Sequence, residues 1–258
     1  MQQVSTTRKW LWSRTGVDQL PLAPPPDKAI RIQADFTAEQ KRLADTWNEQ
    51  GGLLEALSSM AGIEGAAAVA VLAVESQGRG FAPDGRMVIR FENHVFWSQW
   101  GKHQSDRFRE SFRFDEKQRW RGHRFRNGDW VEVHSDQARE WMVFEFARTL
   151  DEEAAIRSTS LGAPQILGLN HGRIGYPTAR QMFAKFQSDI RYQVLGLFDF
   201  LRPSMIAALR ERRYQDFAAR YNGPGRAAKY GEAIERQAEI FRSLQPDCTT
   251  MSLDAGTR

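Results

Sequence analysis

The feature that most restricts the fold of this chain is an apolar run that ends in a carboxylate. From Ala66 to Val74 every residue is Ala, Val or Leu, and Glu75 is the first charged residue after the run. A helix over this run is apolar on all sides, so we expect it to be buried in the middle of the domain. The sequence thus predicts a core helix with an ionisable group at its carboxyl end.

Glu75 is for this reason a candidate acid catalyst. Burial of an ionised carboxylate is costly, so the pKa of Glu75 should be raised towards neutrality. Ser76, Gly78 and Gly80 follow at once, and side chains this small end a helix and leave room for a ligand beside the carboxyl. The alternative is that Glu75 lies in the exposed last turn of a core helix and has no catalytic role.

The length of the chain fits one domain with an extension. Its 258 residues are enough to bury a substantial core. We expect an N-terminal extension over residues 1–35, where the run from Pro24 to Pro26 favours an extended, semi-rigid linker. A catalytic domain is expected over residues 36–245 and a polar C-terminal tail over 246–258.

Hydrophobic periodicity predicts a chain that is mostly helical. A capping-box pattern at Thr37 starts a helix that runs to about Asn48. Gly51 and Gly52 are expected to separate it from a second helix over 53–60. Further helices are expected at about 136–149, 151–157, 178–187, 189–200, 203–212, 214–221 and 226–243.

Two segments carry the signals of β-structure. Residues 87–91 have the β-branched and aromatic content of a short strand. Asn127 and Gly128 lie between alternating apolar residues, and because both accept a positive φ they predict the turn of a β-hairpin. The expected fold class is therefore α+β, predominantly α-helical, with a small β-hairpin or sheet region.

The sequence carries no pattern typical of export or of a membrane span. Only Trp10, Leu11 and Trp12 follow the basic pair Arg8 and Lys9, which is too little apolar sequence for a secretory signal peptide. The longest apolar run is far short of the ~20 residues that a membrane helix needs. We therefore expect synthesis in the cytoplasm of the host.

Cysteine and histidine usage does not indicate a redox or metal centre. Cys248 is the single cysteine, so neither an internal disulfide nor a CxxC motif can form. The five histidines show no metal-binding spacing. We expect chemistry that needs no metal and no cofactor.

The positive charge of the chain gathers in one segment. The net charge is +4. The basic side chains between positions 102 and 126 are Lys102, Arg107, Arg109, Arg113, Lys117, Arg119, Arg121, Arg124 and Arg126. A cationic surface of this kind would attract anionic polymers, which include nucleic acid, teichoic acid, lipopolysaccharide and the bacterial cell wall.

Aromatic residues are interleaved with these basic residues, and they allow two interpretations. They are Phe108, Phe112, Phe114, Trp120 and Phe125. Such residues can form a stacking platform for single-stranded nucleic acid. Alternation of apolar and basic residues is also typical of a half-buried strand or an amphipathic helix, and we favour this structural interpretation.

Three segments far apart in the sequence hold residues suited to binding and cleaving a polymer. The first is the Glu75 segment. The second places Ser160 and Gln165 between glycines, where a polysaccharide can approach the backbone and an amide can both donate to and accept from sugar hydroxyls. The third is a helix end followed by a Gly-Pro turn, which displays Tyr221 and Asn222.

In order and spacing, these segments resemble the phage-type N-acetylmuramidase domain of endolysins. That domain is a branch of the lysozyme-like superfamily and is related to goose-type lysozymes and lytic transglycosylases. The resemblance extends over about residues 40–245 and implies a lysozyme-like fold. The matching motifs are Ala73-Val-Glu-Ser76, Gly80-Phe-Ala-Pro-Asp-Gly85, Ile89-Arg-Phe-Glu-Asn-His94, Ser160-Leu-Gly-Ala-Pro-Gln-Ile-Leu-Gly-Leu-Asn-His171 and Phe217-Ala-Ala-Arg-Tyr-Asn-Gly-Pro224.

The resemblance implies a peptidoglycan hydrolase. The bond cleaved would be the β-1,4 linkage between N-acetylmuramic acid and N-acetylglucosamine, with Glu75 in the position of the catalytic acid. Ser160 and Gln165 fall in the motif that forms the wall of the sugar-binding groove. Tyr221 and Asn222 fall in the motif that lies near the catalytic carboxyl.

Glycoside cleavage also needs a second carboxylate or an activated water near the oxocarbenium-like transition state. Asp84 and Glu92 are the candidates, because the turn and strand that hold them can fold back beside Glu75. We prefer Glu92, which ends an apolar strand, and an ion pair with a neighbouring arginine is its structural alternative. His94 is close enough in the sequence to support this site, or else it has a structural role.

Two other functions remain open at this point. If the second carboxylate is badly placed, the 6-hydroxyl of muramic acid can attack instead of water, as in a lytic transglycosylase that forms 1,6-anhydro ends. The other possibility is a catalytically silent protein that binds cell wall or nucleic acid through residues 102–126. As partners we expect peptidoglycan strands, a holin or other pore for access, and lipopolysaccharide through the same basic segment. The enzyme is expected to be a monomer.

Overall fold

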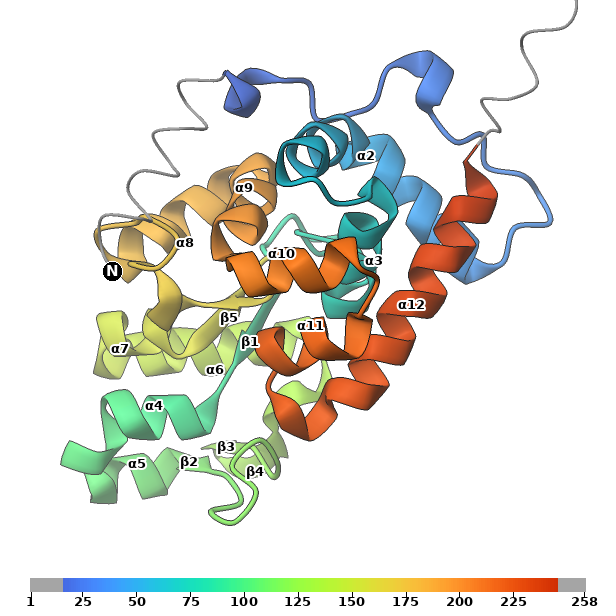
Figure 1. The fold of residues 1–258 in the computed structure, drawn as a ribbon. Helices are drawn as coiled ribbons and strands as arrows, with labels where there is room; N and C mark the ends of the chain where they lie inside the picture. The colour runs from blue at the N-terminus through green and yellow to red at the C-terminus, as the bar shows by residue number, and fades with distance from the viewer. Residues whose placement is uncertain (1–15, 246–258) are drawn as a thin grey trace, which may run out of the picture. The chain divides into compact units, whose positions relative to one another are not determined.

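The structure is a computed structural model that describes residues 16–245 (Figure 1). The first part of the predicted extension, residues 1–15, and the predicted tail with Cys248 lie outside the described residues. The described residues form two compact units. Unit 1 consists of residues 16–18 and 79–201, and unit 2 of residues 19–78 and 202–245.

Unit 2 is built from helices around the predicted apolar run. Its elements are η2 (Pro26–Lys28), α2 (Ala38–Ala61), α3 (Gly65–Ser76), α10 (Pro203–Arg210), α11 (Tyr214–Tyr221), η6 (Pro224–Arg226) and α12 (Ala227–Leu244), and η1 (Val17–Gln19) lies where the chain passes from one unit to the other. Every residue from Gly65 to Leu72 is buried. α3 packs against α2 and α12, which cover the small apolar side chains of this helix (Figure 1). The core helix predicted by the sequence is confirmed.

The predicted break between the first two helices is wrong. α2 is one helix of 24 residues, and the capping box at Thr37 starts it as expected. Gly51 and Gly52 lie inside this helix because their missing side chains make room for neighbours. A Cβ at Gly51 would collide with the ring of Trp47, and one at Gly52 would collide with the backbone of residues 21–23. Glycine in a helix costs about 1 kcal/mol of stability per residue relative to alanine, and close packing at these two positions offsets that cost.

The described part of the N-terminal segment lies along α2. Asn48 exchanges two hydrogen bonds of 2.8 Å with the backbone of Ile30, which is itself buried. The indole N–H of Trp47 donates to the carbonyl of Lys28, also at 2.8 Å. These contacts anchor the segment after Pro26 to unit 2.

Unit 1 holds two small antiparallel sheets. In the first, β5 (Thr159–Leu161) lies between β1 (Ile89–Phe91) and β6 (Ile166–Leu167). In the second, β3 (Arg124–Asn127) lies between β2 (Phe112–Arg113) and β4 (Asp129–Glu132). The predicted hairpin is confirmed, because β3 and β4 are joined at Gly128, which has a φ of 92°.

Helices surround these sheets in unit 1. They are α4 (Asn93–Gln99), η3 (Gly101–His103), α5 (Ser105–Ser111), η4 (Val133–Ser135), α6 (Gln137–Leu150), α7 (Glu152–Arg157), η5 (Gly168–Asn170), α8 (Ala179–Ser188) and α9 (Ile190–Phe200). The helices predicted beyond residue 135 are all present, as α6 to α12, with ends shifted by at most two residues. The predicted class, α+β and predominantly helical, is confirmed.

Most aromatic residues of the basic segment fill the core of unit 1. Phe108, Phe112 and Phe125 are buried. The ring of Phe112 lies 6.0 Å from that of Phe91 and 5.2 Å from that of Phe96, measured between centroids. Burial of these rings leaves no stacking surface at their positions, so it supports the structural interpretation of the interleaved pattern.

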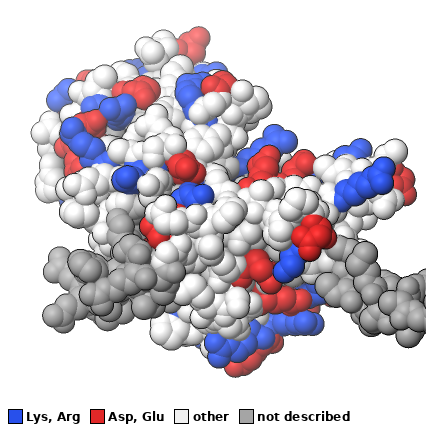
Figure 2. All heavy atoms as spheres, turned by 90° about the horizontal axis from the view of Figure 1, so that it is seen from above, with Lys and Arg blue, Asp and Glu red and all other residues white. Residues whose placement is uncertain are grey.

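Arginines of the same segment rest on aromatic rings. The guanidinium groups of Arg113 and Arg126 lie 3.9 and 5.4 Å from the centroid of the Trp130 ring, which is within cation–π range. Figure 2 shows the face seen from above the view of Figure 1, on which basic and acidic side chains are intermixed.

Between residues 16 and 245, no helix taken singly combines the length and the apolar composition that a membrane crossing requires. The pair α2 and α3 reaches that composition only when the two are joined, and they are bent by 120°.

Candidate active site

Glu75 lies in the last turn of α3, where the backbone turns into the left-handed region. Gln77 and Gly78 have φ values of 59° and 77°, and the N–H groups of both donate to the carbonyl of Leu72. A Cβ at Gly78 would overlap the side chain of Thr46 on α2. Glycine is thus required where the chain leaves the helix, and the predicted helix end is confirmed.

The carboxyl of Glu75 is poorly solvated and accepts a hydrogen bond from an amide. Asn222 Nδ2 donates to Glu75 Oε1 at 2.7 Å. Glu75 as a whole residue is half-buried, but the protein atoms packed around its carboxyl raise its pKa to about 7, against the opposing effect of the Asn222 hydrogen bond. Desolvation is the larger effect, so a large share of Glu75 carries a proton near neutral pH.

The end of α11 brings Asn222 to Glu75 within unit 2. Asn222 caps the carboxyl end of α11 and is followed by Gly223, whose φ is 91°. The ring of Tyr221 stacks on that of Phe217 with centroids 5.2 Å apart, which orients the last turn. The helix end and the glycine turn that the sequence singled out therefore present their amide to the predicted acid.

Ser160 and Gln165 belong to one hairpin of unit 1. Ser160 is half-buried in β5, directly opposite Arg90 of β1. Gln165 has a φ of 49°, and its backbone N–H and its Nε2 both donate to the carbonyl of Gly162, at 3.1 and 2.8 Å. The amide nitrogen of Gln165 thus stabilises the turn, and its amide oxygen can accept a hydrogen bond from a sugar hydroxyl.

Gln193 of α9, which the sequence did not single out, holds this turn in place. It is buried, its Oε1 accepts from the N–H of Ala163 at 2.7 Å, and its Nε2 donates to the carbonyl of Phe186 at 2.8 Å. A Cβ at Gly80 or at Gly162 would collide with the Gln193 side chain. The predicted motifs that contain Gly80 and Gly162 therefore both pack against the buried side chain of Gln193. A single glutamine in an apolar helix gives no sequence signal of this role.

Asp84 forms an exposed turn. Its Oδ2 lies 2.7 Å from a guanidinium nitrogen of Arg86, and its Oδ1 accepts from the backbone N–H of Arg86 at 3.1 Å. The backbone hydrogen bond, followed by that of the side chain, holds the pKa of Asp84 below its usual range. Gly85, with a φ of 79°, completes the turn. The carboxylate of Asp84 is thus engaged in local structure.

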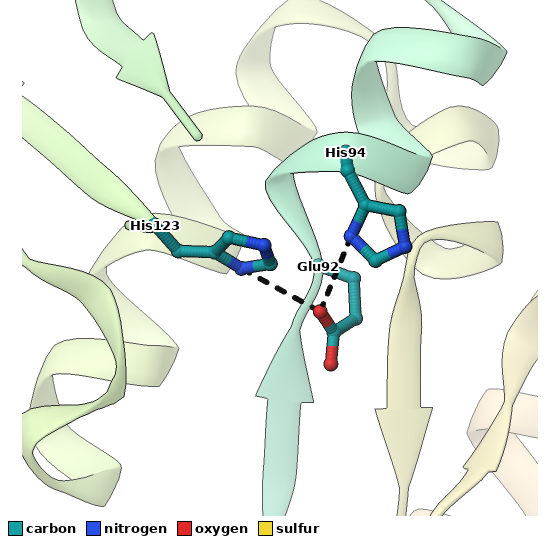
Figure 3. Close-up of side chains that lie close together, drawn as sticks. All are labelled: Glu92, His94 and His123. Carbon is teal, nitrogen blue, oxygen red and sulfur yellow. Dashed lines mark ion pairs between the residues drawn. The ribbon is translucent and has the colours of Figure 1, made fainter. Parts of the chain in front are cut away.

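The carboxylate of Glu92 lies close to one arginine and to two histidines, and the histidines are drawn with it in Figure 3. Its Oε1 accepts a hydrogen bond from Arg90 Nε at 3.0 Å, and its Oε2 lies 3.5 Å from Nδ1 of both His94 and His123. Only 16% of its side chain is exposed. The ion pair that the sequence offered as the structural alternative is present, and His94 reaches Glu92 as the sequence suggested.

The ring of His123 begins a chain of hydrogen bonds that ends at the buried Glu140. His123 Nε2 donates to the carbonyl of Arg119 at 2.7 Å, which leaves His123 Nδ1 as an acceptor for His134 Nε2 at 2.8 Å. His134 Nδ1 lies 2.7 Å from Glu140 Oε1, and Glu140 Oε2 accepts from the N–H of Phe91 at 2.7 Å. We assigned the protons from this network, since a carbonyl can only accept.

Burial keeps the side chains of this hydrogen-bonded network uncharged near neutral pH. Desolvation lowers the pKa of His123 and of His134 to about 4 and raises the pKa of Glu140 to about 8. A protonated Glu140 therefore donates to the free nitrogen of His134. The sequence missed this network, because its members lie in three separate segments that only the second sheet and α6 bring together.

The predicted site residues thus form two groups. In unit 2, Asn222 contacts Glu75, and Tyr221 precedes Asn222 at the end of α11. In unit 1, Ser160 faces Arg90 across the sheet, and the guanidinium of Arg90 holds Glu92.

Comparisons with known proteins found one matching family and a similar solved structure. The profile of the muramidase family, described as N-acetylmuramidase, matches residues 64–242. The crystal structure of Burkholderia AP3 phage endolysin is similar, with a TM-score of 0.55 and 25% sequence identity over 83% of this chain and 74% of that chain. No curated protein matches the chain. The likeness to the endolysin confirms the predicted lysozyme-like α+β fold.

Proposed function

The chain belongs to the N-acetylmuramidase family and is a glycoside hydrolase that acts on peptidoglycan, and we propose that Glu75 is its general acid. The bond cleaved is the β-1,4 linkage between N-acetylmuramic acid and N-acetylglucosamine. The observation that carries this proposal is the half-buried carboxyl of Glu75, whose pKa is raised to about 7 and which accepts a hydrogen bond from Asn222. A catalytic acid works best when its pKa lies near the working pH.

Asn222 can stabilise Glu75 after it has given up its proton. Glu75 gives its proton to the leaving oxygen and becomes a carboxylate in a poorly solvated position. The amide N–H of Asn222 then donates to a charged acceptor, and such hydrogen bonds are stronger than those between neutral groups. Asn222 thereby keeps Glu75 acidic enough to release the proton that desolvation retains.

We assign the second carboxylate to Glu92. Asp84 is exposed and its oxygens are engaged by Arg86 in a turn, whereas Glu92 is mostly buried and its Oε2 faces two imidazoles. Glu92→Gln should lower kcat more than it raises KM, because a charge beside the oxocarbenium ion matters chiefly in the transition state. The matched variant Asp84→Asn should leave both constants unchanged. The opposite pattern would move the assignment to Asp84.

A lytic transglycosylase is the second candidate, and the ion pair between Arg90 and Glu92 favours it. A carboxylate held by a guanidinium is a weaker base towards water. The 6-hydroxyl of muramic acid would then attack the anomeric carbon and form a 1,6-anhydro end. Glu75 protonates the leaving oxygen as before, and its carboxylate takes up the proton that the 6-hydroxyl loses.

Mass spectrometry of the fragments released from purified peptidoglycan distinguishes these reactions. We expect muramic acid at the reducing ends, and anhydro ends in place of reducing ends would identify a transglycosylase. The Glu75→Gln protein should release neither kind of fragment. If the parent protein released none either, it would be a wall-binding protein without activity.

We further propose that the enzyme accumulates in the host cytoplasm and reaches the wall through a separate pore such as a holin. Expression alone should then leave a bacterium intact. Addition of an export signal should cause lysis, and the exported Glu75→Gln protein should not. Lysis without an export signal would contradict this route.

Contact with lipopolysaccharide through residues 102–126 is a proposal that salt dependence tests. Replacement of Arg119, Arg121, Arg124 and Arg126 by glutamine should slow lysis of whole cells more than digestion of purified peptidoglycan. The difference should shrink as salt rises, because exposed charges are screened beyond ~8 Å at physiological ionic strength. Equal slowing of both reactions would show that these arginines serve the fold or the active site.

A further inference from the structure

The imidazoles around Glu92 have the composition of a metal site. Glu92 Oε2, His94 Nδ1 and His123 Nδ1 lie within 4.8 Å of one another (Figure 3). Glu92 follows β1, His94 lies in the first turn of α4, and His123 precedes β3. We propose that these three side chains bind a divalent transition-metal ion, with Zn²⁺ as the representative ion.

The spacing of the donor atoms fits a tetrahedral ion. Glu92 Oε2 lies 3.5 Å from Nδ1 of His94 and from Nδ1 of His123. Zn²⁺ binds imidazole nitrogen and carboxylate oxygen at about 2.0–2.2 Å, so two ligands of one tetrahedral ion lie about 3.4 Å apart. Both distances at Glu92 therefore already have the required length, and the two histidine nitrogens lie within 4.8 Å of each other.

His94 Nδ1 is an unsatisfied buried polar atom. It is a buried ring nitrogen that makes no hydrogen bond with any residue between 16 and 245. Buried polar atoms of this kind are rare because the loss of hydration is uncompensated, and a bound ion is one way to satisfy them.

The orientation of His123 fits the role of a ligand. Its Nε2–H donates to the carbonyl of Arg119, which leaves the lone pair on Nδ1, the atom that lies near Glu92 and His94. Histidines that bind metals nearly always donate their second ring N–H to a carbonyl or carboxylate in this way. His134 Nε2 now donates to the same lone pair at 2.8 Å, so the ion would take the place of that hydrogen bond.

Asn93, which lies between Glu92 and His94 in the sequence, ties α4 to the second sheet. Its Nδ2 donates to the carbonyl of Arg113 on β2 at 2.7 Å and to that of Arg124 on β3 at 2.9 Å. Because Asn93 begins α4, these bonds fix the helix that carries His94 against the sheet next to His123. The ligand positions are therefore built into the fold before any ion binds.

The donor set selects the class of ion. Two imidazoles and one carboxylate suit Zn²⁺ and similar transition metals, whereas Mg²⁺ and Ca²⁺ prefer oxygen ligands throughout. Three protein ligands leave a fourth position for water or a substrate group. His94, with 26% of its side chain exposed, provides the path from solvent.

The ion would link metal concentration to catalysis, because it engages the Oε2 atom of Glu92. This link rests on the proposed function, whereas binding itself needs neither Glu75 nor substrate. Binding is therefore measured directly on the full chain. The Glu75→Gln protein should bind Zn²⁺ with the same affinity as the parent. Zinc binding can therefore be measured even if the proposed catalytic function is wrong.

The experiment is a calorimetric titration of untagged, chelator-treated protein with Zn²⁺. Cys248→Ser serves as the background, since a thiolate is a competing zinc ligand. We expect one equivalent of Zn²⁺ to bind and the melting temperature to rise with excess ion. Glu92→Gln and His94→Gln should each lower the affinity by at least about tenfold, since even the outer partners of metal ligands cost 10- to 100-fold. Mg²⁺ should not bind.

His103→Gln is the matched control, because His103 is an exposed histidine outside the cluster, and its affinity should equal that of the background protein. X-ray absorption of the zinc complex should show two imidazoles at about 2.0–2.1 Å. The proposal is overturned if the titration shows no saturable binding, or if His94→Gln and His103→Gln bind Zn²⁺ equally. An absorption spectrum without imidazole ligands would overturn it as well.

Discussion

Two carboxyls of this protein, Glu75 in unit 2 and Glu140 in unit 1, have raised pKa values for the same reason but in different settings. Desolvation raises the pKa of Glu75 to about 7 and that of Glu140 to about 8. Glu140 is 4% exposed, and its oxygens are engaged by His134 and by the backbone of Phe91. Glu75 is half-buried at a helix end, with Asn222 as its hydrogen-bond donor.

The difference shows that a raised pKa alone does not identify a catalytic acid, because the substrate must also be able to reach the carboxyl. The proton of Glu140 has a fixed acceptor in His134 and no route to a polymer. Glu75 is half-buried in the last turn of α3 and is followed in the sequence by the small residues Ser76 and Gly78. Perturbed carboxyls thus mark candidates, and geometry separates the acid from the structural group.

The largest expected effect is on activity. Glu75→Gln should lower peptidoglycan digestion by about 10²- to 10⁴-fold, because general acid catalysis contributes that much. Glu140→Gln should stay within a few-fold of the parent, since an amide can donate to His134 and accept from Phe91 as the neutral carboxyl does. Initial rates on purified peptidoglycan measure both, with circular dichroism as the check on folding. If Glu140→Gln were the inactive variant, the roles of the two carboxyls would be reversed.

The pH profile is the next test of the comparison. Glu75 must be protonated to act, so activity should fall as pH rises through about 7, by about tenfold per pH unit above that. Measurements of kcat/KM between pH 5 and 9 give this limb for the free enzyme. A rate that remains flat to pH 9 would exclude Glu75 as the titrating acid.

Titration of Glu75 should also make the folded state less stable as pH rises. The folded pKa of Glu75 lies above its ordinary value of 4.5, so the folded state binds the proton more tightly than the unfolded state does. Stability is therefore lost as pH rises from about 4.5 to about 7, by at most about 3 kcal/mol. Glu75→Gln should remove this loss and be more stable than the parent at pH 8 but not at pH 4.

Urea unfolding at the two pH values measures the change in the free energy of unfolding. The comparison of variant with parent at each pH cancels the titration of the buried histidines. A variant that is destabilised equally at both pH values would show that Glu75 contributes packing and pays no desolvation cost.

The smallest expected effect concerns the hydrogen bond to Glu75. That bond lowers the pKa of Glu75, so Asn222→Ala should move the alkaline limb of the activity profile to higher pH. The matched variant Asn222→Asp would place a second carboxyl beside the first and should move the limb further in the same direction. An alkaline limb that stays in place in both variants would mean that Asn222 does not contact Glu75 in the working enzyme.

Sequence patterns predicted α3 and the helices from α6 onward, because these carry their own local signals, whereas α4 and α5 were not predicted. The run from Ala66 to Val74 is apolar on all sides, and the capping box at Thr37 is local. The hairpin at Gly128 is local too. The error at Gly51 and Gly52 has two causes, since Gly51 makes room for Trp47 one turn earlier in the same helix and Gly52 makes room for a segment distant along the chain.

The sequence by itself determined that Glu75 ends a buried helix, because burial of that helix follows from composition alone. Tertiary structure decided which groups surround each carboxyl. Gln193 meets two motif glycines, and Glu92 meets His94 and His123 although 31 positions separate the first of these residues from the last. Such contacts form because the fold brings side chains of distant segments within a few ångströms of one another. The spacing of residues along the sequence does not predict these distances.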